Sequence, residues 1–122
     1  MATINQFEDI QSWKKARDVC EILGDLIDQG RFKKNYRLIH QLEGSSGSIM
    51  DNIAEGFESG SDPEFVRFLK MARRSAGEVQ SQLYLALDVD YITEDERKKT
   101  YDLAIEVKKL INGMMTYLRK TD

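Results

Sequence analysis

The spacing of apolar residues between Tyr36 and Phe57 constrains the fold of this chain more than any other feature. These residues recur at spacings of four or seven, which places them on one face of an α-helix. The stripe comprises Leu38, Leu42, Ile49, Ile53 and Phe57, with Ser46 among them. The sequence therefore predicts an amphipathic helix over 36–57.

The middle of this predicted helix is unusually small, with Gly44, Gly47 and three serines between positions 44 and 48. Because glycine costs roughly 1 kcal/mol in a helix interior relative to alanine, we expect a neighbouring backbone to approach closely here. Asn52 lies at the edge of the apolar face. A buried amide there would need partners, so we expect it to hydrogen-bond across helices. The alternative is a half-exposed side chain without a structural role.

Three further segments show the same periodicity and predict helices at about 10–29, 63–88 and 94–119. Small residues again thin the middle of the third helix, at 72–77, and we expect this region to face 44–48. The apolar stripes comprise Trp13, Ala16, Val19, Cys20, Leu23, Leu26 and Ile27 in the first helix; Phe65, Phe68, Leu69, Ala72, Ala76, Val79, Leu83, Ala86 and Leu87 in the third; and Tyr101, Leu103, Ala104, Val107, Leu110, Ile111, Met114, Tyr117 and Leu118 in the fourth.

Polar residues before these segments mark where helices begin. Asp9 or Ser12 is expected to cap the first helix, and Asp62, followed by the single proline, the third. Thr93 and Glu96 have the spacing of a capping box before the fourth helix. With one proline in 122 residues and no strand-like run, the fold class is all-α. Short connectors predict an antiparallel up-down-up-down four-helix bundle, a single domain over 1–122.

Composition narrows the class of function. The formal net charge is −3, which argues against coating nucleic acid by bulk charge but leaves room for local basic patches. One cysteine permits no internal disulfide, and no apolar run approaches a membrane span. The N-terminus lacks the pattern of a signal peptide. We therefore expect a cytoplasmic protein with no membrane association.

Two basic clusters are candidate nucleic-acid-binding sites. The first connector carries Arg31, Lys33, Lys34 and Arg37 beside two aromatic rings. It is either a phosphate-binding patch with rings for stacking, or a solvated turn whose Phe32 and Tyr36 pack over the end of the bundle. The third helix carries a row uninterrupted by acids, which comprises Arg67, Lys70, Arg73 and Arg74. Such a row is often only a solvated face, yet it is the best candidate in the chain.

Residues for catalysis or metal binding are missing from the expected positions. A di-iron bundle needs a Glu-x-x-His pair on each of two helices, whereas His40 is the one histidine here. Phosphate-loop and Cys-x-x-Cys motifs are also lacking. Trp13 and Cys20 lie on an apolar stripe and are interpreted as core residues. We therefore expect a non-enzyme without metal or cofactor.

Three motifs resemble the four-helix-bundle family encoded in intervening sequences of bacterial large-subunit rRNA genes, often labelled ribosomal proteins. The accessory protein of diversity-generating retroelements is similar. The opening motif comprises Phe7, Ile10, Trp13, Lys14, Lys15 and Ala16. The signature comprises Gln41, Leu42, Ser48, Ile49, Asn52, Ile53, Ala54, Glu55 and Gly56. The third-helix motif comprises Phe65, Phe68, Leu69, Ala72, Ser75, Glu78, Gln82 and Leu83.

This resemblance implies a homopentameric ring and, in some members, nucleic-acid binding through a basic surface. It also suggests a polar network of Asn52, Glu55, Glu78 and Gln82 between the second and third helices. Where the family usually has arginines after its Gln-Leu pair, this chain has 43–45, Glu-Gly-Ser. Two hypotheses follow: a protein associated with ribosomal RNA or another nucleoprotein, or a protein–protein scaffold for a nucleic-acid enzyme that does not touch nucleic acid.

Overall fold

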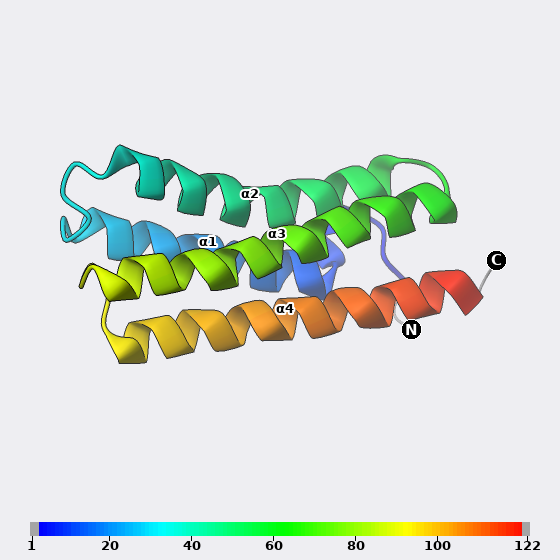
Figure 1. The fold of residues 1–122 in the computed structure, drawn as a ribbon. Coiled ribbons are helices and arrows are strands. Elements are labelled where there is room, and N and C mark those ends of the chain that lie inside the picture. The colour runs from blue at the N-terminus through cyan, green and yellow to red at the C-terminus, as the bar shows by residue number, and fades with distance from the viewer. Residues whose placement is uncertain (1–2, 121–122) are drawn as a thin grey trace.

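Four α-helices run alternately up and down beside one another in the computed structural model, which describes residues 3–120 (Figure 1). They are α1 (Gln11–Asp28), α2 (Tyr36–Glu58), α3 (Asp62–Asp88) and α4 (Glu94–Lys120), after a short 3-10 helix η1 (Phe7–Asp9). Residues 3–120 contain no strand. The predicted all-α antiparallel four-helix bundle is confirmed, and η1 is an element that the periodicity did not predict.

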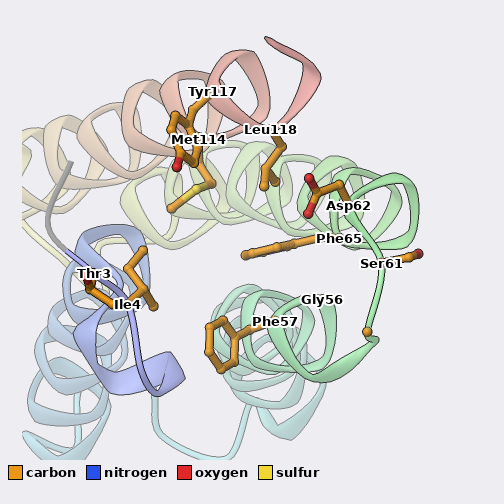
Figure 2. A pocket seen from close by; sticks show the side chains of 11 residues that line it. Thr3, Ile4, Gly56, Phe57, Ser61, Asp62, Phe65, Met114, Tyr117 and Leu118 are labelled. Carbon is orange, nitrogen blue, oxygen red and sulfur yellow. The ribbon is translucent and has the colours of Figure 1, made fainter. Parts of the chain in front are cut away.

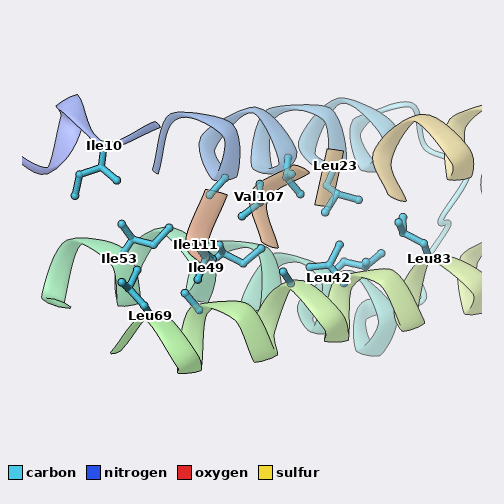
Figure 3. Packing of buried hydrophobic residues seen from close by; sticks show 14 of the residues in the cluster. Ile10, Leu23, Leu42, Ile49, Ile53, Leu69, Leu83, Val107 and Ile111 are labelled. Atoms are coloured by element: carbon cyan, nitrogen blue, oxygen red, sulfur yellow. The ribbon is translucent and has the colours of Figure 1, made fainter. Parts of the chain in front are cut away.

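One apolar core lies between the four helices. Each helix packs against two neighbours, so that α1 and α3 both contact α2 and α4. Figure 3 shows Ile49 and Ile53 of α2, Leu69 of α3 and Ile111 of α4 converging in the interior, and all four side chains are fully buried. Short connectors enforce this antiparallel arrangement, because consecutive helices must return along the one before.

Helix α1 faces the core with a slightly different stripe from the predicted one. Val19 and Leu26, predicted only to broaden the stripe, are buried at its centre. Trp13 and Ile27 are half-buried against the core, and Cys20 is half-buried as well. Burial raises the pKa of the Cys20 thiol, which suits a packed thiol rather than an activated one. The predicted face of α1 does point to the core, but its most buried line runs through Val19 and Leu26.

The N-terminal cap predicted for α1 is wrong. The cap position is occupied by Ile10, which is 1% exposed and has no polar side chain to offer. Ser12 is instead buried within the helix, and the Asp9 carboxylate accepts a hydrogen bond from the backbone N–H of Asn5. The chain enters α1 through the core, so packing of an apolar side chain takes precedence over capping at this position.

The caps of α3 and α4 differ in how well the pattern predicted them. Ser61, not Asp62, caps α3, since its hydroxyl accepts from the Glu64 N–H at 3.3 Å. Before α4 the capping box is confirmed. The Thr93 hydroxyl accepts from the Glu96 N–H at 3.1 Å, and the Glu96 carboxylate accepts from the Thr93 N–H at 2.8 Å.

The N-terminal segment completes the core where α1 is too short to do so. Helix α1 has 18 residues and α4 has 27, about 27 Å against about 40 Å. Residues 4–10 lie over the uncovered end, where the Phe7 ring meets Trp13 edge-on at 5.2 Å. Figure 2 shows Ile4 across an open hollow of about 430 Å³ from Phe57 and Phe65.

The small residues in the middles of α2 and α3 do meet, as predicted. The Ser75 hydroxyl donates to the Ser48 hydroxyl at 2.9 Å across the two helices. The reason that we gave for the glycines is wrong, however. A Cβ atom added at Gly44, Gly47 or Gly77 would meet nothing within 4 Å, so these glycines face open space rather than a neighbouring backbone.

The close approach between α2 and α3 occurs at Gly56 instead. A Cβ atom there would lie 2.8 Å from Cδ1 of Phe65 and 3.0 Å from Cβ of Phe68. Both distances are shorter than ordinary carbon–carbon contact. Gly56 therefore lets the end of α2 pack against the first turns of α3.

The polar network predicted between α2 and α3 does not form as expected. The Asn52 amide donates to the carbonyl and hydroxyl oxygens of Ser48, on its own helix, at 2.8 and 3.0 Å. Asn52 therefore reaches α3 only through Ser48. Within residues 3–120, Glu55 and Glu78 are exposed and make no hydrogen bond or ion pair, and Gln82 Oε1 is buried without a partner.

The two kinds of glycine should respond in opposite ways to alanine. Gly56→Ala should lower the free energy of unfolding by about 1–3 kcal/mol, because Phe65 and Phe68 must move. Gly44→Ala, on the same helix, should raise it by about 1 kcal/mol, because the new methyl group meets no atom and favours the helix. Urea denaturation followed by circular dichroism measures both. A Gly56→Ala variant as stable as the parent would contradict the close packing.

Candidate nucleic-acid interface

Four basic side chains line an open cleft of about 350 Å³ between α3 and α4. Lys70, Arg73 and Arg74 come from α3, where spacings of three and four place them on adjoining positions of one face. Lys108 comes from α4, and Gly77 forms part of the lining. Three residues of the predicted basic row are thus brought together with a fourth cation from another helix.

Neutral amides orient two of these cations. Arg73 donates from Nη1 to Oδ1 of Asn112 at 2.8 Å, and the Lys108 ammonium donates to Oε1 of Gln80 at 2.9 Å. Neither partner carries a charge, so orientation is achieved without neutralisation. In the described part of the chain, none of the four cations forms a salt bridge with a carboxylate.

Gly77 forms part of the cleft lining and faces open space. It lies one turn beyond Arg73 and Arg74 on α3, and a Cβ atom built on it would meet nothing within 4 Å. A larger side chain here would project into the space that the cations surround. Glycine lowers the stability of a helix interior by roughly 1 kcal/mol relative to alanine. No neighbouring atom requires a glycine at this position.

Arg67 does not belong to this cleft. Its guanidinium donates from Nε and Nη2 to the two carboxylate oxygens of Glu64, at 3.1 and 2.9 Å, and stacks over the Phe68 ring at 4.5 Å. These hydrogen bonds lower the pKa of the Glu64 carboxyl. The charge of Arg67 is therefore compensated on its own helix, although the sequence placed this residue in the same row.

The connector between α1 and α2 is largely a packed turn. Phe32 is 1% exposed and contacts the Tyr91 ring at 5.1 Å, whereas Tyr36 is 58% exposed. Arg31 donates to the Glu96 carboxylate at 2.7 Å and so links the connector to α4. The interpretation as a turn over the bundle end is right for Phe32 and wrong for Tyr36.

The remaining cations of the connector are separated from the cleft. Lys33, Lys34 and Arg37 are exposed and form no salt bridge within residues 3–120. They lie at the end of the bundle where α1 leads into α2 (Figure 1), whereas the cleft residues of α3, within 70–77, lie midway along that helix. The two predicted clusters therefore form two surfaces rather than one.

Lys108 is the residue that the analysis of the sequence missed. Nothing in the spacing along α4 distinguishes it from the other lysines of that helix. The signal was the short turn at 89–93, since antiparallel helices place residues at similar distances from their turn opposite one another. The contact from Arg73 to Asn112 follows this rule approximately, at 18 and 21 residues from residue 91. Lys108 lies farther from the turn than Gln80, at 17 residues against 11, so its position opposite the row on α3 was not fixed by this rule alone.

Four other hollows of the described surface have at most one cation each in their linings, whereas the cleft between α3 and α4 has four. The two larger ones lie at the end covered by the N-terminal segment, and both contain Ile4 and Met114 in their linings. Within residues 3–120, no three potential metal-binding side chains converge. No helix in the same range is long and apolar enough to cross a membrane.

The protein is an antiparallel four-helix bundle with a basic cleft between α3 and α4. The chain belongs to the family of 23S rRNA-intervening sequence proteins, whose sequence profile matches residues 8–113. A similar fold occurs in a protein of unknown function from the S23 ribosomal protein family of Bacteroides thetaiotaomicron. The two share 23% identity over 85% of this chain and 97% of the other, with a TM-score of 0.77. No curated protein matches the chain significantly.

The contact between Arg31 and Glu96 should make stability depend on acid. The Arg31 guanidinium and, next, the Thr93 backbone lower the pKa of Glu96 from about 4.5 to about 2. A depressed carboxyl pKa stabilises the fold above the unfolded value, and this contribution is lost as pH falls from about 4.5 to about 2. The stability advantage of the parent over Glu96→Gln should therefore shrink across that range, measured by urea midpoints.

Glu106→Gln serves as the matched control for this test. Glu106 pairs with Lys15 at 3.5 Å on the exposed surface, and Glu96 is intact in the variant. Its loss of stability between pH 4.5 and 2 should follow the parent. A Glu96→Gln protein with the same acid profile as the parent would contradict the assigned role of Arg31.

Proposed function

We propose that this protein is a non-catalytic, oligomeric helical bundle of the bacterial cytoplasm that binds ribosomal RNA, alone or within a nucleoprotein. The observation that carries the proposal is the cleft of Lys70, Arg73, Arg74 and Lys108, whose charges no carboxylate of the described chain neutralises. Phosphate groups are the natural ligands for such a cluster, because arginine binds them through two parallel hydrogen bonds and lysine as a point charge.

Local charge matters more here than the net charge of −3. At physiological salt the Debye length is about 8 Å, so acidic residues on distant faces are screened from a phosphate in the cleft. The four cations lie within a single hollow between two helices. The cleft is therefore an attractive site for a phosphodiester even though the chain as a whole is acidic.

The family supports an RNA ligand, since its name refers to intervening sequences of 23S rRNA. The motif departure at 43–45 does not weaken the cleft. Glu43, Gly44 and Ser45 belong to α2, whereas the cleft is built from α3 and α4. Loss of the arginines usual in the family at that place removes positive charge from a different helix.

Self-association would strengthen binding by each cleft. We propose a homo-oligomer, with the pentamer of the resembling family as the expected state. In a ring, several copies of the cleft can bind the same RNA. Once one cleft is bound, binding by the next is intramolecular, so the overall affinity exceeds that of a single cleft. Each cleft then needs to bind only a short part of the RNA.

Neutralising the cleft should weaken RNA binding. Arg74→Gln with Lys108→Gln should reduce affinity for a labelled 23S rRNA fragment on the order of tenfold at low salt, because two phosphate contacts are lost. The slope of log affinity against log salt should fall by about two. Fluorescence polarisation across a salt series measures both quantities. Absence of binding by the parent protein at low salt would contradict the proposed function.

Arg67→Gln is the control variant on the same helix. It removes one positive charge, as each cleft substitution does, from a residue already paired with Glu64. Its affinity and salt slope should stay close to those of the parent. A loss as large as that of the cleft variant would show that binding follows total charge rather than the cleft.

The second candidate is an oligomeric protein–protein scaffold for a nucleic-acid enzyme that does not itself touch nucleic acid, and an exposed apolar pair favours its self-association. Leu85 of α3 and Val89, the residue directly after that helix, are 53% and 51% exposed. Together with Leu38 of α2 they line a hollow of about 300 Å³. Exposed apolar side chains that adjoin one another mark contact surfaces. We assign this pair to contact with a second copy of the chain.

Sedimentation velocity tests this assignment. The parent protein should sediment as an oligomer at micromolar concentration, and Leu85→Glu should shift it toward smaller species, because a charge would be buried in the contact. Tyr117→Glu, at a residue of similar exposure near the end of α4, should leave the distribution unchanged. A monomeric parent would contradict self-association.

A further inference from the structure

A half-exposed aromatic ring lies beyond the basic cleft along the same pair of helices, α3 and α4. Tyr84 follows Gly77 by seven residues on α3, which is two helical turns and about 10 Å along the axis. Tyr84 is 44% exposed. The spacing of seven returns Tyr84 to the face of α3 that carries Gly77, so the ring lies beyond the cleft on the path between the two helices.

Contacts with α4 place the cleft and Tyr84 along the same pair of helices. Along α3, Arg73 contacts Asn112, Gln80 contacts Lys108, and Tyr84 contacts Arg97. Each partner on α4 lies farther toward the turn at 89–93 than the one before. The cleft and Tyr84 therefore occupy successive positions along the α3/α4 pair, with the Gln80–Lys108 hydrogen bond between them.

The Tyr84 ring is held in place from two sides. The Arg97 guanidinium lies 5.0 Å from its centroid and donates from Nη1 to its hydroxyl oxygen at 3.3 Å. The Tyr101 ring meets it edge-on at 5.9 Å. Arg97 is itself fixed by an ion pair with Glu94 at 2.6 Å. A ring that is both immobilised and exposed loses little conformational entropy when a planar ligand stacks on it.

We propose that the α3/α4 pair binds single-stranded RNA, with a phosphate in the basic cleft and an unpaired base stacked on Tyr84. This inference rests on the proposed function and narrows its ligand. Duplex RNA hides its base faces within the helix, whereas unpaired bases are free to stack on aromatic side chains. A phosphate-binding cleft alone would accept either form, and Tyr84 supplies the preference.

The same helix pair predicts that the bound RNA segment is short and that its sequence matters little. Asp88, one turn beyond Tyr84, brings negative charge to that end, which disfavours further phosphates there. The amides of Gln80 and Asn112 are engaged with Lys108 and Arg73 rather than directed at base edges. Stacking accepts every base because each has a π-face.

Fluorescence polarisation with an unstructured RNA oligonucleotide and a duplex of the same sequence tests the proposal. Tyr84→Leu removes the ring and should weaken single-strand binding on the order of tenfold, with duplex binding within about twofold of the parent. Tyr84→Phe keeps the ring and should retain single-strand affinity. Tyr117→Leu, at a residue of similar exposure outside the cleft, should behave as the parent does.

Crosslinking of the unaltered protein to an oligonucleotide that contains 4-thiouridine provides a measurement independent of variant stability. Mass spectrometry should place the crosslink on the peptide that contains Tyr84 or on the one that contains Tyr101. Equal affinities for the two RNA forms, with no effect of Tyr84→Leu and crosslinks elsewhere, would overturn this inference while the cleft variants still lose binding. Failure of the parent to bind either RNA would overturn it together with the proposed function.

Discussion

The structure depends on the burial of one apolar stripe from each of four antiparallel helices. Removing such side chains from water is the dominant favourable term in folding, and here it fixes both the rotation of each helix and the register between neighbours. Leu69 and Leu83 of α3 and Val107 and Ile111 of α4 are all fully buried. These core contacts also determine which residues at the edges of neighbouring stripes lie opposite one another. The basic cleft and the Tyr84 ring are consequences of this register.

Electrostatic environment, rather than residue type, separates the cations of the cleft from those that hold the fold together. Arg31 and Arg67 each donate to a carboxylate, of Glu96 and Glu64. Arg73 and Lys108 donate to neutral amides and keep their full charge. A cation already paired has little attraction left for a phosphate, since the ligand must compete with a carboxylate within hydrogen-bond distance. The surface with uncompensated positive charge is therefore smaller than the count of basic residues implies.

Small residues have two different roles in the helix interiors. Gly56 accommodates the Phe65 and Phe68 side chains, and Ser48 and Ser75 link α2 to α3 through their hydroxyl groups. Gly77, by contrast, faces open space within the cleft lining. Glycine and serine lower helix propensity in either role. The pattern of small residues in the sequence therefore could not distinguish close packing from open space.

The sequence by itself determined the four helices, their antiparallel order and most of the core, because apolar periodicity and turn chemistry are local properties. The capping box of Thr93 and Glu96 was predictable for the same reason. Local pattern failed where packing took precedence, as at Ile10, which occupies the cap position of α1. It also failed where partners come from distant segments. Only the tertiary structure decided that Lys108 joins the row on α3 and that Arg31 is bound to Glu96, 65 residues away. Such pairings depend on the register of two helices about the core, which no spacing within one helix records.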